Sequence, residues 1–324
     1  MRVCILTDED PIDFDPTPYM AGFDWEMVTM TDPVMEVLRA LDARQEFDVY
    51  LNLCEGYEKD DDAEWEYQGI DVVRALEELN LPFTGADSKF FDPTREEMQA
   101  AADANDVGFA KGYQVKSAEE AERLVQHLRY PIMVKHPKSY GSTGMFKHSK
   151  VETPEQLRSQ LDRICAEFGA ARMEEFIVGK EYNVLVIDDP DDLENPIAYP
   201  PAELVFPPGE EFWHTDIKWD YNVPFDFKRV TDTELVGRLQ DITIQMYKAM
   251  EGVGYGRCDI RMNEKGELFI LEINPNPAIM LKPEEYGPAD YVILYDSGGY
   301  KVFFERLFRV AQIRHQKRLQ AQGS

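Results

Sequence analysis

Hydrophobic residues in the first ninety positions fall into short runs separated by segments of helical spacing. Apolar runs at residues 3–6, 49–53 and 82–85 predict strands, and apolar positions within 34–43 and 69–79 recur every three or four residues, as in helices. Strands that alternate with helices favour a parallel sheet. We therefore predict an α/β domain over residues 1–90, with its ligand cleft at the carboxyl ends of the strands.

Beyond residue 90 the pattern indicates helices mixed with strand pairs. Helices are expected over residues 94–105, 117–129, 153–168 and 232–250, and strands over 112–115 and 131–135. A last amphipathic helix is expected over 302–319, with Phe303, Phe304, Leu307, Phe308 and Val310 on its apolar side. Its basic end, residues 314–318, is interpreted as exposed surface. The acidic run at 58–66 is interpreted as a solvated loop.

The most informative stretch is a hairpin predicted near the C-terminal end. Two strands flank a turn at residues 263–266, and alternation with period two gives them one polar and one apolar face. The polar face carries Arg257, Asp259 and Arg261 on the first strand and Glu272 and Asn274 on the second. The apolar face is expected to contain Cys258, Ile260, Met262, Phe269, Leu271 and Ile273. Hairpin pairing would bring Asp259 close to Glu272.

Such a group of oxygens suits a hard divalent cation. Mg²⁺ or Mn²⁺ prefers carboxylate and carbonyl oxygens and often shares them with substrate phosphates. We therefore predict a metal site formed by Asp259, Glu272 and Asn274. The alternative is a solvated strand face, which a lone acidic pair would indicate.

A glycine-containing loop follows a buried strand that ends in Lys135. The loop spans residues 140–145 and leads into a second strand, so it predicts a hairpin and not the strand-to-helix turn of a Walker A motif. Its backbone N–H groups at Ser142, Thr143 and Gly144 would close over phosphates as a flap. An ordinary flexible hairpin is the alternative, and Lys135 with the distal acids favours the flap.

Together these parts resemble the ATP-grasp enzymes, and within them the D-alanine–D-alanine ligase group, most strongly over residues 131–277. The resemblance implies an α/β ATP-grasp fold: an N-terminal Rossmann-like (pre-ATP-grasp) domain and two α+β lobes that enclose the nucleotide. The implied boundaries are residues 1–90, 91–173 and 174–322. ATP and Mg²⁺ or Mn²⁺ are the implied cofactors.

The resemblance also implies residues that hold the nucleotide. Residues 171–181 match the family's hinge, where Glu174 and the backbone at Glu175 and Ile177 would meet the adenine edge. Glu181 would accept hydrogen bonds from the ribose hydroxyls. The alternative is that these acids are surface residues flanking a strand.

Further likeness concerns the reacting groups. Residues 215–221 match a mobile loop, preceded by a lid-like run at 203–212, and Lys218 would close on the terminal phosphate. Ser142 of the flap is a further catalytic candidate. Arg257 would stabilise the oxyanion of the tetrahedral intermediate, alongside the backbone near Ala278. For Lys218 the alternative is a solvated lysine, and for Arg257 it is an ion pair with Glu272.

Departures from the family bear on the nucleotide and the substrates. A nucleotide-contacting lysine is replaced by Pro93, and Arg95 or Lys89 would compensate only in part. The serine that seats the acceptor carboxylate in the D-alanine ligases is also absent, since the segment reads Ala278 to Pro283 here.

Three charged residues bear on the substrates themselves. Lys282 is either a point charge for a substrate carboxylate or a solvated lysine. Glu9 and Glu55 border the N-terminal cleft and favour a substrate that carries an ammonium group.

The charge composition limits the classes of binding partner that we expect. With 34 basic and 62 acidic side chains the net charge is −28, which argues against nucleic acid and anionic membranes as partners. The four cysteines lack paired spacing, and no signal peptide or membrane span is visible, so we expect a cytoplasmic protein. A homodimer is the expected assembly to test, and small carboxylates and amines, chiefly amino acids, are the expected substrates.

The sequence therefore predicts an ATP-dependent carboxylate–amine ligase that works through an acyl phosphate and is not dedicated to D-alanyl-D-alanine. Two alternatives remain open: a phosphotransferase that makes an acyl phosphate without an amide, and a catalytically weak ATP-binding regulator.

Overall fold

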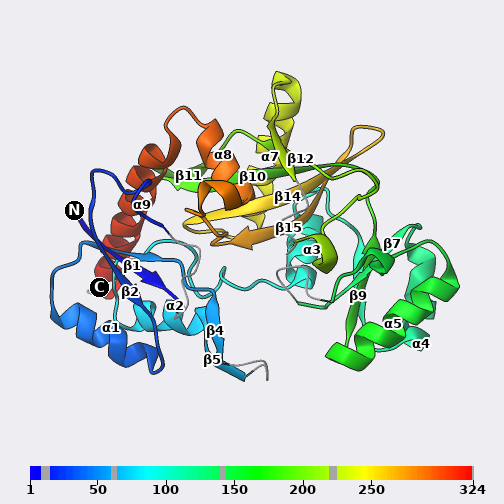
Figure 1. Cartoon of the computed structure of the whole chain (residues 1–324), viewed down its shortest axis with the longest axis horizontal. Helices are drawn as coiled ribbons and strands as arrows, with labels where there is room; N and C mark the ends of the chain where they lie inside the picture. The colour runs from blue at the N-terminus through cyan, green and yellow to red at the C-terminus, as the bar shows by residue number, and fades with distance from the viewer. Residues whose placement is uncertain (9–14, 60–63, 139–143, 219–224, 323–324) are drawn as a thin grey trace.

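In a computed structural model of the chain, residues 1–8, 15–59, 64–138, 144–218 and 225–322 are described (Figure 1). The N-terminal sheet is parallel, as predicted, with β1 (Arg2–Thr7) between β2 (Asp24–Thr29) and β3 (Val49–Asn52). The sequence did not predict β2, an edge strand without a fully buried residue. The strand expected at 82–85 is reduced to a single bridge between Tyr50 and Phe83.

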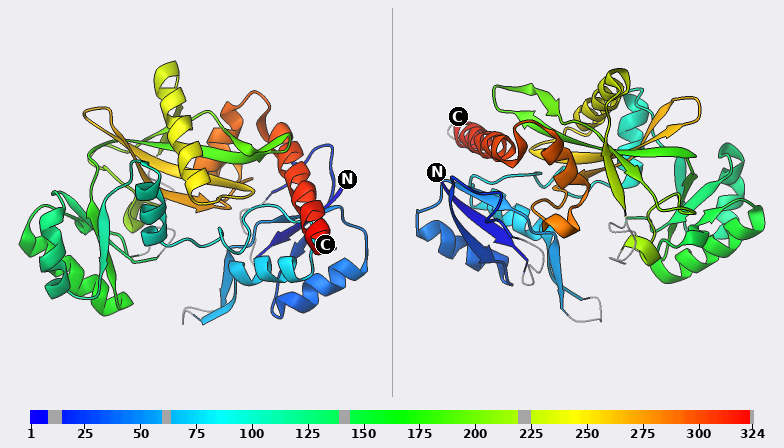
Figure 2. Two further views of the ribbon diagram at one scale, coloured as in Figure 1. Left: turned by 180° about the vertical axis from the view of Figure 1, so that it is seen from behind. Right: turned by 45° about the horizontal axis from the view of Figure 1, so that its top comes forward.

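The two faces of this sheet have different covers. Cys4 and Leu6 point towards α1 (Val34–Ala43) and α2 (Gly69–Glu78), whereas Val3 and Ile5 pack into a cluster with the C-terminal helix α9 (Gly299–Gln322). Figures 1 and 2 show α9 lying beside the N-terminal sheet. The N-terminal unit is therefore completed by the far end of the chain.

The basic end of α9 is not free surface, and that interpretation was wrong. Arg314 donates to the backbone oxygen of Gly85 at 2.5 Å, and Arg318 donates to that of Leu81 at 2.6 Å. Both guanidinium groups also lie over the ring of Phe83, at 5.4 and 5.1 Å from its centroid. These contacts tie α9 to the segment that follows α2.

The central lobe is a four-stranded antiparallel sheet in the order β6-β9-β7-β8. Its strands are β6 (Gly112–Val115), β7 (Ile132–Lys135), β8 (Lys150–Val151) and β9 (Ala171–Glu175). One face is covered by α4 (Ala118–Leu124), continued by η1 (Val125–His127), and by α5 (Pro154–Phe168). The other face presents the polar side chains discussed below. A 3-10 turn, η2 (Lys147–Ser149), precedes β8.

The C-terminal lobe is built on a six-stranded antiparallel sheet in the order β13-β12-β10-β14-β15, with β11 also paired to β10. Its strands are β10 (Gly179–Asp189), β11 (Asp192–Ala198), β12 (Ala202–Val205), β13 (Asp226–Arg229), β14 (Tyr255–Asn263) and β15 (Leu268–Pro275). Its helical elements are α6 (Thr215–Lys218), α7 (Thr233–Ala249), η3 (Pro283–Glu285) and α8 (Pro288–Tyr295).

Helix α3 (Arg95–Ala104) lies against this C-terminal sheet. Met98 and Ala102 share a core with residues of α7 and of strands β10, β14 and β15, although the sequence assigned the helix to the central lobe. The first residue of α3 is consequently held near β15, and this position matters for the site.

The acidic run at residues 58–66 is not simply a loop. It forms part of a hairpin of β4 (Gly56–Lys59) and β5 (Glu64–Gln68), so that expectation was wrong for the paired residues. No helix among the described residues is long and apolar enough to cross a bilayer. Cys4, Cys54 and Cys258 are buried and Cys165 is partly exposed, and all four are free thiols.

Candidate active site

Strand pairing places the predicted polar face of the C-terminal hairpin as expected. Asp259 lies opposite Glu272, and Arg257 lies opposite Asn274, so the four side chains share one face of the sheet. On the other side of β14, Asn183 of β10 lies opposite Asp259. The hairpin therefore contributes two carboxylates and an amide, and the neighbouring strand adds a second amide.

The apolar face departs from the prediction at one point. A β-bulge after Asp259 leaves Leu271 without a direct partner, so Ile260 pairs with Ile270 and Arg261 pairs with Phe269. Ile270 thus enters the core, and Phe269 shifts to the face of Arg261. The placement of Phe269 and Leu271 on the buried face was wrong, because period two cannot register an extra residue.

Each carboxylate of the hairpin has an arginine partner. Arg257 donates to both oxygens of Asp259, at 2.7 and 2.9 Å. Glu272 instead forms an ion pair with Arg95, at the start of α3. The alternative pairing of Arg257 with Glu272 is therefore replaced by two separate pairs.

The surroundings keep Glu272 ionised. Burial by itself would raise its pKa, but the positive charges of Arg95, Lys135 and Arg257 outweigh burial and lower the pKa to about 2. The same acid thus feels cations from β7, β14 and α3. This links the hairpin of the C-terminal lobe electrostatically to the central lobe.

The donor chemistry at this face fits a hard cation. Amides of Asn183 and Asn274 donate to Asp259 at 2.7 and 3.2 Å, and the buried Oδ1 of Asn183 has no hydrogen-bond partner in the described part of the chain. A buried oxygen beside the Asp259 carboxylate is a ready cation ligand. The described residues contain no cluster of three acidic, histidine or cysteine side chains fit for a metal, so phosphates and water would complete the coordination.

The polar face of the central sheet carries the predicted lysine. Lys135 forms an ion pair with Glu174, whose other oxygen accepts from Arg172 at 2.7 Å. Burial and nearby Arg95 lower the pKa of Lys135 to about 8, against the attraction of Glu174 and Glu272. The pKa of Glu174 is lowered, because Lys135 and Arg172 outweigh its burial. The surface interpretation of Glu174 is wrong, since the residue is 3% exposed.

The two other hinge acids are also buried. Glu181 accepts from Arg261 at 2.9 Å, and burial raises the pKa of its carboxyl group despite that partner. Arg261 further donates to the backbone oxygen of Ile177 at 2.9 Å. Glu175 turns away from this cluster and forms an ion pair with Arg129 at 2.9 Å. Residues 174–181 are therefore held by ion pairs and hydrogen bonds to Arg129, Lys135, Arg172 and Arg261.

The lid-like run and the flap meet in the structure. Thr215 donates its backbone N–H to the oxygen of Met145 at 2.8 Å, and Lys147 pairs with Glu210 at 2.8 Å. Helix α6 ends at Lys218, and residues 203–205, expected in the lid-like run, form the end of strand β12.

Parts of the flap and of the N-terminal cleft have no described structure. Gly144 has φ +66°, and a Cβ there would lie 2.8 Å from the ring of Phe168, so glycine is required. The predictions for Ser142, Thr143 and Glu9 concern positions outside the described residues.

Near the expected substrate side, Asp8 organises the start of the loop after β3. It accepts from the backbone N–H groups of Glu55 and Gly56 at 2.9 and 3.2 Å. The side chain of Glu55 is exposed at this edge. The structure thus places Glu55 at the carboxyl end of the parallel sheet, as predicted.

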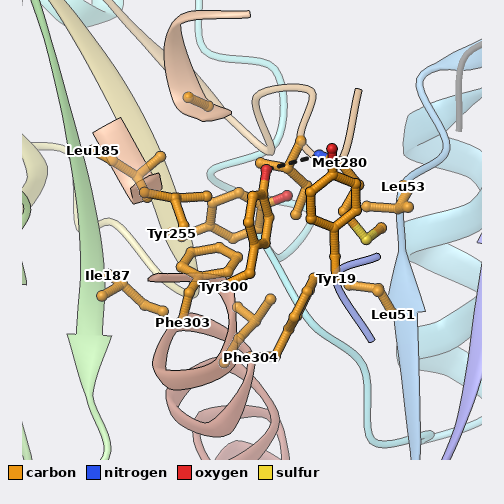
Figure 3. Packing of buried hydrophobic residues seen from close by; sticks show 14 of the residues in the cluster. Tyr19, Leu51, Leu53, Leu185, Ile187, Tyr255, Met280, Tyr300, Phe303 and Phe304 are labelled. Carbon is orange, nitrogen blue, oxygen red and sulfur yellow. Dashed lines mark hydrogen bonds between the residues drawn. The ribbon is translucent and has the colours of Figure 1, made fainter. Parts of the chain in front are cut away.

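The loop after β15 is held by a buried acid that sequence reasoning missed. Asp290 accepts from the backbone N–H groups of Met280 and Gly287 at 2.8 and 2.9 Å and from the hydroxyl of Tyr300. Burial raises the pKa of Asp290 to about 6. Tyr300 also contacts the N–H of Met280, beside Tyr19 (Figure 3). Ala278 and Lys282 lie in this loop, and both are partly exposed.

The chain is similar in sequence to D-alanine–D-alanine ligases. A family model described as D-ala D-ala ligase C-terminus matches residues 103–280, more than half of the chain. A D-alanine–D-alanine ligase of Acinetobacter baylyi is 25% identical over 64% of this chain and 65% of its own length. One of Oceanobacillus iheyensis is 26% identical over 77% of this chain and 67% of its own length. The matched region thus spans about two thirds of these curated relatives.

Solved structures share the whole fold. The D-alanine–D-alanine ligase of Coxiella burnetii superposes with a TM-score of 0.71 at 14% identity, over 99% of this chain and 96% of that one. The VanG D-Ala:D-Ser ligase of Enterococcus faecalis gives 0.69 at 14% identity, over 96% and 99%. With the family match, the predicted ATP-grasp fold is confirmed, and the chain belongs to the D-alanine–D-alanine ligase family of ATP-grasp proteins.

Proposed function

We propose that this chain is an ATP-dependent carboxylate–amine ligase that forms an amide bond through an acyl phosphate. The observation that carries the proposal is the convergence of Lys135, from the central lobe, with Arg95 and Glu272 at the edge of the C-terminal lobe. Cations and anions from both lobes meet at this point, which suits a bound polyphosphate with its metal.

The proposed roles follow from the contacts. Asp259, Glu272 and Asn274 would hold Mg²⁺ or Mn²⁺, with Asn183 as a further oxygen donor. Such a cation, when bound, neutralises charge on the phosphates. Lys135 would bind phosphate oxygens, and Glu181 would orient the ribose. The hinge at Glu174, Glu175 and Ile177 would position the adenine.

In the reaction, a substrate carboxylate oxygen attacks the γ-phosphorus and ADP leaves, which gives an acyl phosphate. An amine then attacks the acyl carbon, and inorganic phosphate leaves as the amide forms. Arg257 would donate to the oxyanion formed in the second step, and Lys218 would neutralise the phosphoryl group in the first. Ser142 and its neighbours Thr143 and Gly144 would cover the phosphates.

The substrates we propose are small amino acids. The named relatives are D-alanine–D-alanine ligases and one neighbour is a D-Ala:D-Ser ligase, so a D-amino acid is a first candidate on at least one side. Glu55, and Glu9 by sequence, would attract an ammonium group. We also predicted that D-alanine is a poor substrate when it has to serve as both the acid and the amine, and this stays a prediction.

A screen of paired amino acids and small carboxylates tests the proposal. ADP release is measured for each pair with Mg²⁺ present, and products are identified by mass spectrometry. ADP release that depends on both an acid and an amine, with a product of amide mass, is expected. ADP release without any amine requirement would indicate the phosphotransferase, and ATP binding without turnover of any pair would indicate the regulator.

A further inference from the structure

Arg95 occupies a rigid position beside the hairpin. It is the first residue of α3, directly after the N-cap Thr94, whose side chain accepts from the N–H of Glu97 while the Glu97 carboxylate accepts from the N–H of Thr94 at 2.7 Å. This capping box fixes the first turn of the helix. Because α3 packs on the C-terminal sheet, the cap delivers the side chain of Arg95 to β15.

Two features of β15 receive the guanidinium group. One nitrogen pairs with the carboxylate of Glu272, and the other donates to the backbone oxygen of Leu271 at 3.3 Å. Leu271 is the bulge residue, so it has no direct partner on β14. The side chain of Arg95 is only 11% exposed and that of Glu272 is 23% exposed.

The charges around Arg95 are arranged in an unusual way. Arg95 and Lys135 are like charges close enough for each to matter to the other, and Arg95 contributes to the lowered pKa of Lys135. Two partly buried cations repel unless anions separate them, and here Glu272 and Glu174 do so. A set of neighbouring cations is also what a polyphosphate requires.

We propose that Arg95 is a phosphate-binding residue of the nucleotide site: Glu272 holds it in the free protein, the phosphates of a bound nucleotide draw it away, and a divalent metal then takes its place beside Glu272. This inference rests on the proposed function. A metal ion gives Glu272 a new positive partner, and phosphate oxygens give Arg95 a new negative one, so both charges stay paired after the exchange. A guanidinium fork suits both partners, since it binds carboxylate and phosphate through two hydrogen bonds.

The exchange predicts opposite effects on metal and nucleotide, which separates it from a purely structural ion pair. We would measure the Kd of ADP in EDTA by titration calorimetry, and the Kd of Mn²⁺ without nucleotide by electron paramagnetic resonance. For Arg95→Gln we expect ADP to bind at least tenfold more weakly in EDTA and Mn²⁺ at least fivefold more tightly. Arg95→Lys should lose less ADP affinity than Arg95→Gln, because the positive charge remains although the two-bond fork is lost.

The Glu272→Gln variant provides an independent test of the role of Arg95. It releases Arg95 and removes a repelling charge, so ADP should bind at least fivefold more tightly in EDTA, and the gain should shrink in the double variant with Arg95→Gln. Arg158→Ala is the matched control, because Arg158 pairs with Glu119 and Glu122 on the outer surface and should leave both constants unchanged.

The outcomes are distinct. Unchanged ADP affinity in Arg95→Gln would show that Arg95 is only a structural ion pair. If that variant does not fold by circular dichroism, the Glu272→Gln arm decides, and no gain in ADP affinity there overturns the inference. Failure of wild-type protein to bind ADP even with Mg²⁺ would instead overturn the proposed function.

Discussion

Arg257 and Asp259 lie two residues apart on β14, and the guanidinium group of Arg257 forms two hydrogen bonds, of 2.7 and 2.9 Å, with the carboxylate of Asp259. The pair points to the same face as Glu272, which has its own arginine. Arg257 is thus oriented by a proposed metal ligand, and it does not compete with the metal for Glu272.

Replacing Arg257 tests whether it acts in the reaction or only balances Asp259. For Arg257→Ala we expect kcat to fall about 10²–10³-fold, roughly 2.7–4 kcal/mol, as on loss of an oxyanion donor. The affinity for ADP with Mg²⁺ should change far less. If the affinity for Mg²⁺–ADP falls as much as kcat does, Arg257 only balances the charge of Asp259 and does not act in the reaction.

Glu272→Gln should abolish turnover and leave the fold intact. The substitution keeps the shape of the side chain but removes one charge from the group proposed to hold Mg²⁺ against water. Turnover and far-ultraviolet circular dichroism are the measurements. Glu264→Gln, in the turn of the same hairpin, is the control and should retain wild-type turnover. Wild-type turnover by Glu272→Gln with the same Mg²⁺ dependence would dismiss the site.

Local alternation was enough to predict part of this site. The predicted polar face is kept because the bulge follows Asp259. The pairs Arg257–Asn274 and Asp259–Glu272 lie before the bulge on β14 and stay in register. The sequence could not place Phe269, since one extra residue inverts the faces beyond the bulge.

Long-range contacts were harder to predict. Arg95 meets Glu272 across 177 positions, and Arg314 meets Gly85 across 229. A charge run or a lone arginine has no local pattern that identifies its partner, so Arg95 was predicted only as a partial substitute for a lysine and residues 314–318 as exposed surface. Asp290 was missed for the same reason, although its place three residues after Gly287, just inside a helix that begins with Pro288, was a signal for a capping residue.

Lys218→Ala should lower turnover far more than it weakens ADP binding. On the proposed lid, the ammonium group would meet the terminal phosphate only when the lid is closed, so its contribution appears in the transition state. A cost of roughly 2–4 kcal/mol in the barrier is expected. We would compare kcat with the Kd of ADP. Equal losses in the two quantities would place Lys218 on the phosphates that ADP retains.

Lys135 should make nucleotide binding depend on pH near 8. Because its pKa in the free protein is about 8, Lys135 is mostly protonated at pH 7 and mostly neutral at pH 9. Phosphates favour the charged form, so ADP affinity should fall over this range, and binding at pH 8 should take up roughly half a proton. Calorimetry in two buffers of different ionisation enthalpy measures the uptake.

The control for this titration is Lys135→Arg, which stays charged at all these pH values. Its ADP binding at pH 8 should show no proton uptake. Uptake that persists in Lys135→Arg would assign the titration to another group.

The last prediction concerns the acceptor substrate and the loop after β15. The N–H groups of Met280 and Gly287 donate to the protein's own Asp290, and Tyr19 donates to the backbone oxygen of Leu281 at 2.6 Å. A D-alanine carboxylate seated there would have to do without these donors, and an underpaired buried charge costs about 1–3 kcal/mol or more. Lys282 would compensate only as a point charge.

We therefore expect little ADP release when D-alanine is the only substrate. We expect much more when another amino acid or amine is added, together with D-alanine or with a different carboxylic acid. ADP release at equal concentrations of each pair, with mass spectrometry of the product, measures the preference. Lys282→Ala should weaken only acceptors that carry a carboxylate, which distinguishes a point charge from a solvated side chain. Rapid, Mg²⁺-dependent synthesis of D-alanyl-D-alanine by the wild-type protein would contradict the prediction and make D-alanine the substrate on both sides.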